Sequence, residues 1–132
     1  MKLLTRNTDY GIRALCFIAK ENGRIIAVPE FVKALKVPRP FLRKILQALA
    51  KNGFIRSHRG IGGGFRLAIP PDKLYIVEVA ETFQGPMDLN ECFLKKKICP
   101  DRKRCPLKKK MDKIEKYVIS ELSSITIGEL LK

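Results

Sequence analysis

The N-terminal half of the chain carries three stretches in which apolar side chains recur at helical spacing. The first covers residues 7–22, with Asn7 or Thr5 as its cap and Gly23 just beyond its end. A second, short helix is predicted from Pro29 to about Leu35. A third is predicted from the Pro38–Pro40 segment to Asn52, because proline is tolerated in the first turn of a helix and not inside it.

Each of the two longer helices has a distinct apolar face. In the first helix, we expect the core residues to be Tyr10, Ala14, Phe17 and Ile18. In the third, the predicted apolar stripe is Phe41, Leu42, Ile45, Leu46 and Leu49, and the side chains that project elsewhere are Arg39, Arg43, Lys44, Gln47 and Lys51. Two helices joined by a few residues, the second with basic and amide side chains outward, are typical of a helix-turn-helix.

The segment FIRSHRGIGGGFRLAI alternates around a cluster of glycines. It predicts strands over Phe54–His58 and Phe65–Ile69, with Gly60–Gly64 as their turn. A hairpin directly after a helix-turn-helix is a wing. The glycines do not form a phosphate-binding P-loop, because no Lys-Ser/Thr pair follows them and they lie inside a hairpin.

The C-terminal part is predicted to contain a helix over residues 74–83, an irregular loop over 86–105 and a long helix from Pro106. The apolar residues of the long helix follow one another at spacings of four, three, four and four: Leu107, Met111, Ile114, Val118 and Leu122. So narrow a seam favours pairing with a second copy of the chain over packing on its own domain. The predicted fold is mainly α with a small β-hairpin wing, divided into a winged helix-turn-helix DNA-binding domain (1–73) and a loop with dimerisation helices (74–132).

The composition of the chain predicts a polyanionic partner. The 132 residues include 27 Lys and Arg against 13 Asp and Glu, a formal net charge of +14. Such an excess favours binding to nucleic acid. The longest uncharged apolar run near the N-terminus, Ala14 to Ala19, is too short for a signal sequence or a membrane span. We therefore expect a cytoplasmic protein whose thiols are reduced.

Three of the four cysteines lie in the basic segment ECFLKKKICPDRKRCP, residues 91–106. Six residues separate Cys92 from Cys99 and five separate Cys99 from Cys105, gaps too wide for a zinc knuckle. The neighbouring Lys and Arg favour thiolates, which hold iron–sulfur clusters. Spacing alone leaves an iron–sulfur cluster, zinc and a thiol–disulfide switch open. The fourth cysteine, Cys16, is expected to be a small buried hydrophobe. The only histidine, His58, is more easily a strand or phosphate contact than a metal ligand.

Several of these strings together resemble the Rrf2 family of winged-helix regulators, of the IscR, NsrR and RirA type. The matching strings are TDYGIRAL, PFLRKILQALAKNGFIRSHRGIGGGFRLA, the cysteine triplet and ITIGELL, which cover nearly the whole chain in the right order. The resemblance implies a homodimer that binds operator DNA and, in many members, an iron–sulfur cluster as sensor. It also implies that Arg59 enters the minor groove. Arg43 departs from the family, because the members compared carry an acidic residue there.

The resemblance bears on the fourth cluster ligand as well. One branch uses a histidine three residues after the third cysteine, a position that Lys108 occupies here. The NsrR branch uses an aspartate of the first helix, supplied across the dimer, and Asp9 stands at the matching place. An acidic residue is favoured in a first helical turn in any case, and Arg13 can pair with it. Solvent, Glu91 and a small thiol are the other candidates.

We therefore predict a DNA-binding transcription regulator controlled by a [4Fe–4S] or [2Fe–2S] cluster, and no enzyme, since no nucleophile stands beside a base. The predicted cluster ligands are Cys92, Cys99, Cys105 and Asp9. The predicted DNA contacts are Arg39, Arg43, Lys44, Gln47, Arg59, Gly62 and Gly63. The alternative is a clusterless regulator that acts as a thiol-oxidation switch or through a partner protein or small effector.

Overall fold

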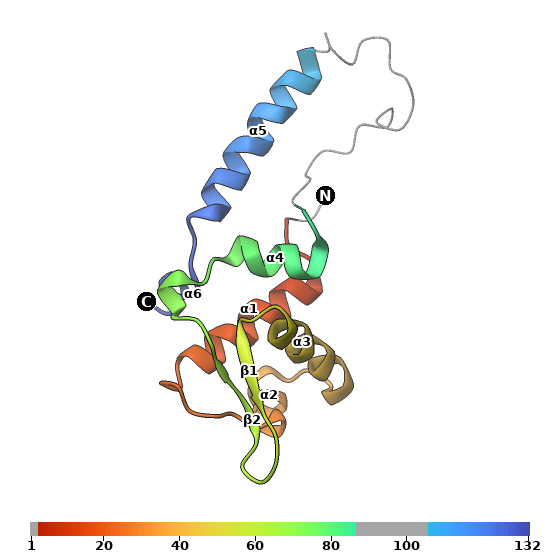
Figure 1. Ribbon diagram of the computed structural model, residues 1–132. Helices are drawn as coiled ribbons and strands as arrows, with labels where there is room; N and C mark the ends of the chain where they lie inside the picture. The colour runs from red at the N-terminus through yellow and green to blue at the C-terminus, as the bar shows by residue number, and fades with distance from the viewer. Residues whose placement is uncertain (1–2, 87–105) are drawn as a thin grey trace.

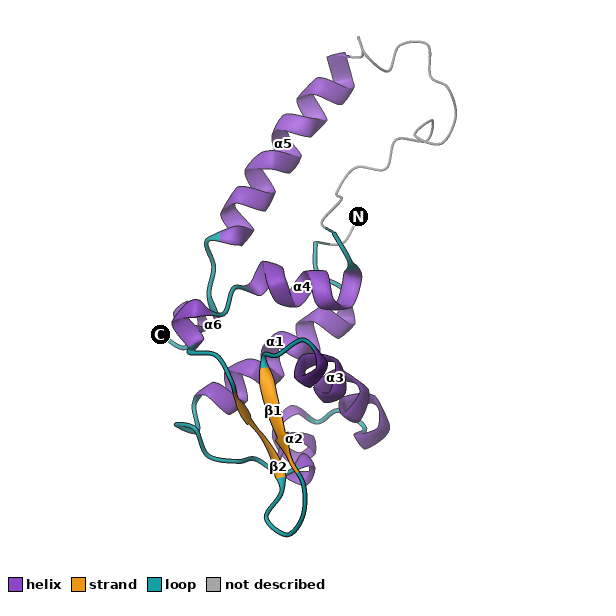
Figure 2. Cartoon of the chain, viewed as in Figure 1, coloured by secondary structure: helices purple, strands orange, loops and turns teal. Residues whose placement is uncertain are grey.

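The computed structural model describes residues 3–86 and 106–132, which form a helical body, a two-stranded wing and one long projecting helix (Figures 1 and 2). In chain order the elements are α1 (Arg6–Ala19), α2 (Val28–Leu35), α3 (Arg39–Lys51), β1 (Ile55–His58), β2 (Gly64–Leu67), η1 (Pro71–Lys73), α4 (Ile76–Gln84), α5 (Pro106–Ser123) and α6 (Ile127–Leu130). The predicted fold class, mainly α with a β-hairpin wing, is confirmed.

Capping residues and prolines set the helix bounds close to where the sequence placed them. Thr5 caps α1 by accepting a hydrogen bond from the Thr8 N–H at 3.3 Å. The helix ends three residues earlier than predicted, because Asn22 and Gly23 both adopt left-handed backbone conformations, with φ of 51° and 82°. Helix α3 starts after Pro38 as predicted and stops at Lys51, one residue short of the predicted end.

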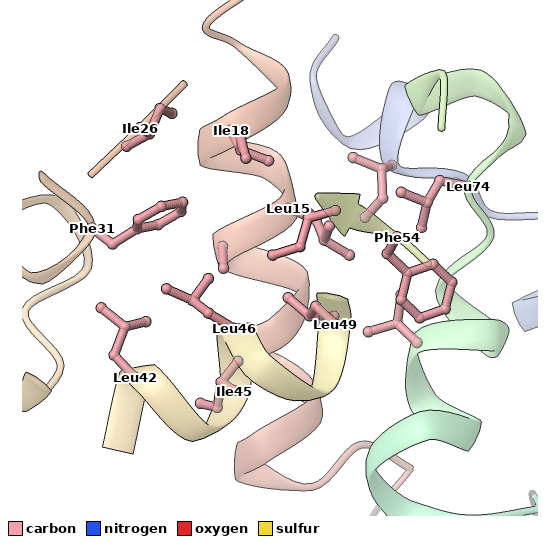
Figure 3. Packing of buried hydrophobic residues seen from close by; sticks show 14 of the residues in the cluster. Leu15, Ile18, Ile26, Phe31, Leu42, Ile45, Leu46, Leu49, Phe54 and Leu74 are labelled. Carbon is pink, nitrogen blue, oxygen red and sulfur yellow. The ribbon is translucent and has the colours of Figure 1, made fainter. Parts of the chain in front are cut away.

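The core is built around α1 and α3 (Figure 3). Its largest fully buried side chains are Leu15, Ile18, Ile26, Phe31, Leu42, Leu46, Leu49, Leu74, Val79, Ile127 and Thr8. Two predicted assignments need correction. Leu15, which was not in the predicted core face, is fully buried, whereas Tyr10 and Phe17 are only partly buried. Phe41 leaves 41% of its surface exposed and meets the Tyr10 ring edge-on, with ring centroids 5.7 Å apart.

The wing is an antiparallel hairpin with a third, short attachment to the body. β1 and β2 pair from Ile55 opposite Leu67 to His58 opposite Gly64. On the other edge of β2, Phe65 forms two backbone hydrogen bonds with Ile26, of 2.8 and 2.9 Å. The strands are shorter than predicted, and the N–H of Phe54 instead donates to the Leu49 carbonyl at the end of α3. The wing is therefore fixed to both α3 and the segment that precedes α2.

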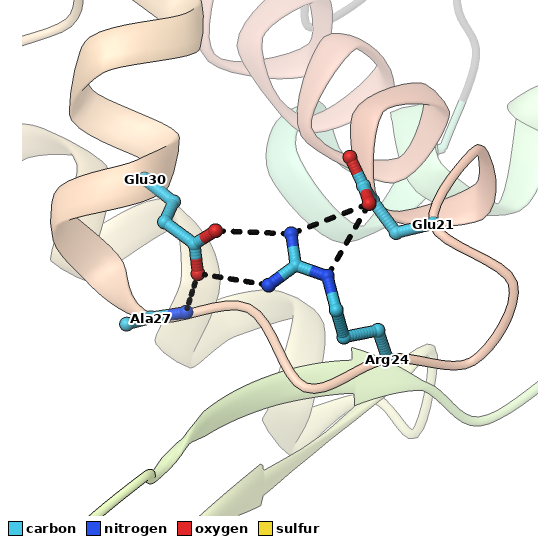
Figure 4. A network of polar contacts seen from close by, with 4 residues as sticks. All are labelled: Glu21, Arg24, Ala27 and Glu30. Carbon is cyan, nitrogen blue, oxygen red and sulfur yellow. Dashed lines mark hydrogen bonds and ion pairs between the residues drawn. The ribbon is translucent and has the colours of Figure 1, made fainter.

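An ion-pair network fixes the start of α2 (Figure 4). The Arg24 guanidinium donates to Glu30 at 2.9 Å and to Glu21 at 3.2 Å, and Glu30 also accepts from the Ala27 N–H at 2.9 Å. Hydrogen bonds to Glu30 and then Glu21 raise the pKa of Arg24. The bond from Arg24, followed by that from Ala27, lowers the pKa of Glu30. This network ties the end of the α1 segment to the first turn of α2.

The C-terminal segments share the core of the N-terminal part. Leu74, Ile76, Val79 and Ile127 belong to the same buried cluster as α1 and α3. The short helix α6, which hydrophobic periodicity did not reveal, begins at Thr126, whose hydroxyl accepts from the Glu129 N–H at 3.2 Å. The core thus continues across residue 73, while the functional division into 1–73 and 74–132 remains a prediction.

Helix α5 is exposed along most of its length. It contains no buried residue, and Leu107 and Ile114 of the predicted seam are 69% and 55% exposed. Only Leu122, near its end, packs against the core. The seam is thus free to meet a second copy, and pairing of two copies remains a prediction. None of the described helices is both long and apolar enough to cross a membrane.

Candidate nucleic-acid interface

An open groove of about 440 Å³ lies between α3, the start of α2 and the wing. Its lining residues are Ala27, Val28, Pro29, Arg39, Arg43, Gln47, Ser57, His58, Arg59, Gly60, Gly63, Gly64 and Phe65. Five of the predicted DNA contacts therefore share one surface: Arg39, Arg43, Gln47, Arg59 and Gly63. Lys44 is exposed on α3, and Gly62 lies in the wing turn, but neither lines the groove.

The α3 side of the groove follows from the two faces of that helix. Leu42, Leu46 and Leu49 are fully buried, which turns the opposite face outward. Arg39, Arg43 and Gln47 follow one another at intervals of four residues on that exposed face, so their side chains form one row. The row reaches from the first turn of α3 toward its middle.

The groove is positively charged, with no acidic side chain among its lining residues. Arg39, Arg43 and Arg59 take part in no ion pair within residues 3–86 and 106–132. Three guanidiniums without a carboxylate partner, on an open surface, suit a polyanion whose phosphates can supply the missing acceptors. The groove fits a nucleic-acid backbone better than a small uncharged ligand.

The far side of the groove is the wing turn, where two glycines have different roles. Gly62 has a left-handed backbone, with φ of 76°, and open space where a Cβ would lie. At Gly63 a Cβ would collide with the His58 carbonyl oxygen and come within 2.8 Å of the Gly60 carbonyl oxygen. The Gly63 N–H donates to that Gly60 oxygen at 2.9 Å and closes the turn. Only glycine at 63 allows the chain to fold back so tightly.

Sequence reasoning missed part of this surface. It did not assign Ser57, or the Ala27–Pro29 segment that precedes and opens α2, to the groove. Pro29, which marks the start of α2, was the available signal for that segment. His58 also lines the groove, and its Nε2 is buried without a hydrogen-bond partner in the described structure. The role of His58 as a strand or phosphate contact stays a prediction.

The predicted cluster ligands are placed only in part. Cys92, Cys99 and Cys105 lie outside the described residues. Asp9 is on α1, where its carboxylate accepts from Arg13 Nε at 2.8 Å in an exposed ion pair. Within residues 3–86 and 106–132, no three His, Cys, Asp or Glu side chains come together as a metal site. Cys16 is half-buried against the core, and burial raises the pKa of its thiol, which disfavours the thiolate.

Comparison with known proteins agrees with this geometry. The family model Rrf2, described as an iron-dependent transcriptional regulator, matches residues 4–132. The chain belongs to the Rrf2 family. NsrR, an HTH-type transcriptional regulator of Bacillus subtilis, is 29% identical over 131 residues, which cover 98% of this chain and 90% of NsrR. A candidate HTH-type regulator of Aquifex aeolicus is 32% identical over 124 residues, or 92% of this chain and 86% of that protein.

Solved structures support the fold of this Rrf2 protein. The structure of CymR, named as the global cysteine regulator of B. subtilis, superposes with a TM-score of 0.83 at 22% identity, over 99% of this chain and 97% of CymR. Membership of a family of transcriptional regulators means that the chain is a DNA-binding transcriptional regulator and not an enzyme, as the sequence predicts.

Lys108 stands at the position where, by resemblance, one branch of the family carries a histidine, and it forms an ion pair within α5. Lys108 Nζ donates to Asp112 Oδ2 at 2.7 Å, one turn along α5. The fourth ligand of the predicted cluster stays a prediction.

Gly63→Ala should distort the wing turn more than Gly62→Ala. The first adds a methyl group against two carbonyl oxygens, whereas the second meets only the cost of a left-handed backbone, about 1 kcal/mol. Denaturant unfolding and amide chemical shifts of residues 58–65 measure the two effects. Equal losses of stability and equal shifts for the two variants would show that the close approach at Gly63 does not shape the turn.

Proposed function

We propose that the chain acts in the cytoplasm as a homodimeric operator-binding regulator whose affinity for DNA is controlled by an iron–sulfur cluster. The observation that carries the DNA part is the groove between α3 and the wing, whose lining includes Arg39, Arg43 and Arg59, none of which has a carboxylate partner within residues 3–86 and 106–132. In this proposal α3 enters the major groove and the wing turn lies at the adjacent minor groove. The DNA backbone between them occupies the groove of the protein.

The side chains of α3 divide between base contacts and phosphate contacts. Arg39 and Arg43 are one helical turn apart, and a guanidinium can donate two hydrogen bonds to the major-groove edge of guanine. Gln47, one turn further, suits adenine for the same geometric reason. Lys44 is exposed beside this row and suits a phosphate. Arg59, on the wing side, suits the negative potential of a narrow minor groove.

The cluster part of the proposal rests on the chemistry of the cysteine segment and on the contacts of α4, the helix that precedes this segment in the sequence. Three thiolates in a basic segment, with an aspartate as fourth donor, are a donor set that fits an iron–sulfur cluster. The family description as iron-dependent agrees with such a cofactor. When bound, the cluster would supply a centre that changes with redox state or with a reactive small molecule. Cys92, Cys99, Cys105 and Asp9 are the residues proposed to hold it.

Contacts at the end of α4 support a route from that segment to the DNA-binding surface. Gln84 Oε1 accepts from the Thr5 N–H at 3.0 Å and from the Thr8 hydroxyl at 2.8 Å, and Gln84 Nε2 donates to the Leu3 carbonyl at 3.0 Å. One turn later on α1, Gly11 allows the Phe83 ring to approach so closely that a Cβ would collide with it. The last turn of α4 is thereby held against the start of α1.

This attachment gives Asp9 a structural context. Asp9 lies between Thr8, which is fully buried beneath Gln84, and Gly11, which packs on Phe83. In the sequence, the proposed cluster segment begins seven residues after Gln84. If Asp9 of one copy binds the cluster of the other, the state of the cluster acts directly on α1, which packs on α3. The exposed seam of α5 supports the dimer that this arrangement requires.

Arg43→Ala should weaken operator binding by about 1–3 kcal/mol and relax the preference at one base pair, because a guanidinium that contacts a base carries sequence information. The control is Lys51→Ala, which removes an exposed charge of α3 outside the groove. Binding to a panel of operator variants at fixed salt measures both quantities. If affinity and sequence preference match those of the control, Arg43 is a solvated charge.

Cys92→Ala, Cys99→Ala and Cys105→Ala should each abolish stable cluster binding, whereas Cys16→Ala should retain it. The half-buried Cys16 has a raised thiol pKa and packs in the core, so it is a poor iron ligand. Iron and sulfide analysis and visible absorbance of anaerobically purified protein test this. Full iron content in a variant of the triplet removes that cysteine from the ligand set, and a colourless parent protein contradicts the cluster proposal as a whole.

Asp9→Ala should keep the fold but change the absorbance spectrum and the lifetime of the cluster. The matched control is Arg13→Ala, which removes the same 2.8 Å ion pair and leaves the carboxylate in place. Both variants lose the Asp9–Arg13 ion pair, so any effect of that loss is the same in the two. The effect should be small, because an exposed ion pair contributes little to the stability of the fold. A cluster whose spectrum and lifetime in Asp9→Ala equal those in Arg13→Ala would exclude Asp9 as a ligand.

A further inference from the structure

Two arginines stand directly opposite each other on the wing. In the register of the hairpin, Arg56 of β1 pairs with Arg66 of β2, and both side chains are exposed. Like charges at directly opposed positions of an antiparallel pair repel each other and destabilise the hairpin. Stability of the free protein therefore does not explain this pair. A ligand that supplies negative charge between them would.

The protein itself supplies no such charge in its described part. Neither Arg56 nor Arg66 forms an ion pair or side-chain hydrogen bond within residues 3–86 and 106–132. Arg56 also borders an open depression of about 520 Å³ between β1 and the end of α3. The other residues of this depression are small or apolar and none is acidic: Ala50, Gly53, Ile55, Ser57 and Ala68.

The two arginines lie on the face of the wing that points away from the hydrophobic core, which is its outer face. The preceding cross-strand pair is Ile55 and Leu67; Ile55 is buried in the core and Leu67 packs against it. Successive residues of a strand point to opposite faces, so the Arg56–Arg66 pair projects from the outer face. Arg59, in the turn, adds a third positive charge to the wing.

We propose that Arg56 and Arg66 form a second phosphate-binding surface, which contacts the DNA strand on the far side of the minor groove from α3. This inference rests on the proposed function, in which the wing turn lies at the minor groove. Arg56 is three residues from Arg59, about 10 Å along an extended strand. The minor groove is about 7.5 Å deep, so a wing inserted at its tip brings Arg56 and Arg66 level with the bordering phosphates.

The wing is then held between two backbones. The inner groove, with Arg39, Arg43 and Arg59, contacts the strand that separates the major from the minor groove, and the outer pair contacts the other strand. A DNA phosphate is the anion that the position favours over an acidic protein segment, because the outer face continues into the turn proposed to meet DNA. Contacts of this kind add affinity without sequence preference.

The test uses Arg56→Gln, Arg66→Gln and the double variant, with Lys73→Gln as a control that removes an exposed charge beyond the base of the wing. The probe is a fluorescent operator duplex selected from random DNA by the parent protein and titrated anaerobically from 50 to 200 mM KCl. For the double variant, the slope of log affinity against log salt concentration should be less steep by about 1.8. Its loss of affinity relative to the parent protein should therefore be about twelvefold smaller at the high-salt end of this range than at the low-salt end.

Three further measurements separate this role from a structural one. The melting temperature of the free double variant should equal or exceed that of the parent, because a repulsion is removed. Arg56→Lys with Arg66→Lys should restore the salt slope. Hydroxyl-radical footprinting should show lost protection on the far strand of the minor groove, with guanine protection in the major groove retained.

The outcomes distinguish this inference from the proposed function. A double variant whose salt slope and footprint match those of Lys73→Gln, in a preparation where the parent binds its duplex tightly, overturns the second phosphate surface and leaves operator binding intact. A parent protein that selects no duplex from random DNA overturns both.

Discussion

The buried face of α1 is the constraint on which the other elements depend. Ala14, Leu15 and Ile18 expose at most 1% of their surfaces, and the helix contacts α2, α3, α4, α6 and β2. A close-packed interior yields little to small displacements, so elements seated on one helix hold fixed positions relative to each other. The proposed DNA-contacting helix α3 and the helix α4, which precedes the cysteine segment in the sequence, are therefore both held by the same rigid element.

This arrangement explains why a cluster outside the groove can act on DNA in the proposed mechanism. Leu42, Leu46 and Leu49 fix the angle of α3 on α1, which determines where Arg39 and Arg43 project. The amide of Gln84 and the ring of Phe83 fix α4 against the first turns of α1. A change in the segment after α4 acts on α1 through those contacts. No separate hinge is needed, because the shared helix already connects the two surfaces.

Features that depend on local backbone preferences could be predicted from the sequence, whereas features that depend on contacts between distant elements could not. The start of α3 and the wing turn were predictable, because prolines and glycines act through their own backbone. The burial of Leu15 in place of Tyr10 was not, since it depends on how α4 and α6 cover α1. Phe41 fits the apolar stripe of α3, but it leaves 41% of its surface exposed and meets the ring of Tyr10 edge-on. The opposition of Arg56 and Arg66 required the register, which alternation alone does not fix to the residue.

The same distinction applies to charge. The net charge of +14 predicts a polyanionic partner but not its position. In the described structure, none of the ion-paired acids lines the groove or belongs to the wing strands: Asp9 pairs with Arg13, Glu21 and Glu30 with Arg24, and Asp112 with Lys108. Within residues 3–86 and 106–132, no such partner exists for Arg39, Arg43, Arg56, Arg59 or Arg66. In the proposed DNA complex, the attraction therefore comes from two surfaces of the described structure that carry arginines and no carboxylate: the groove beside α3 and the outer face of the wing.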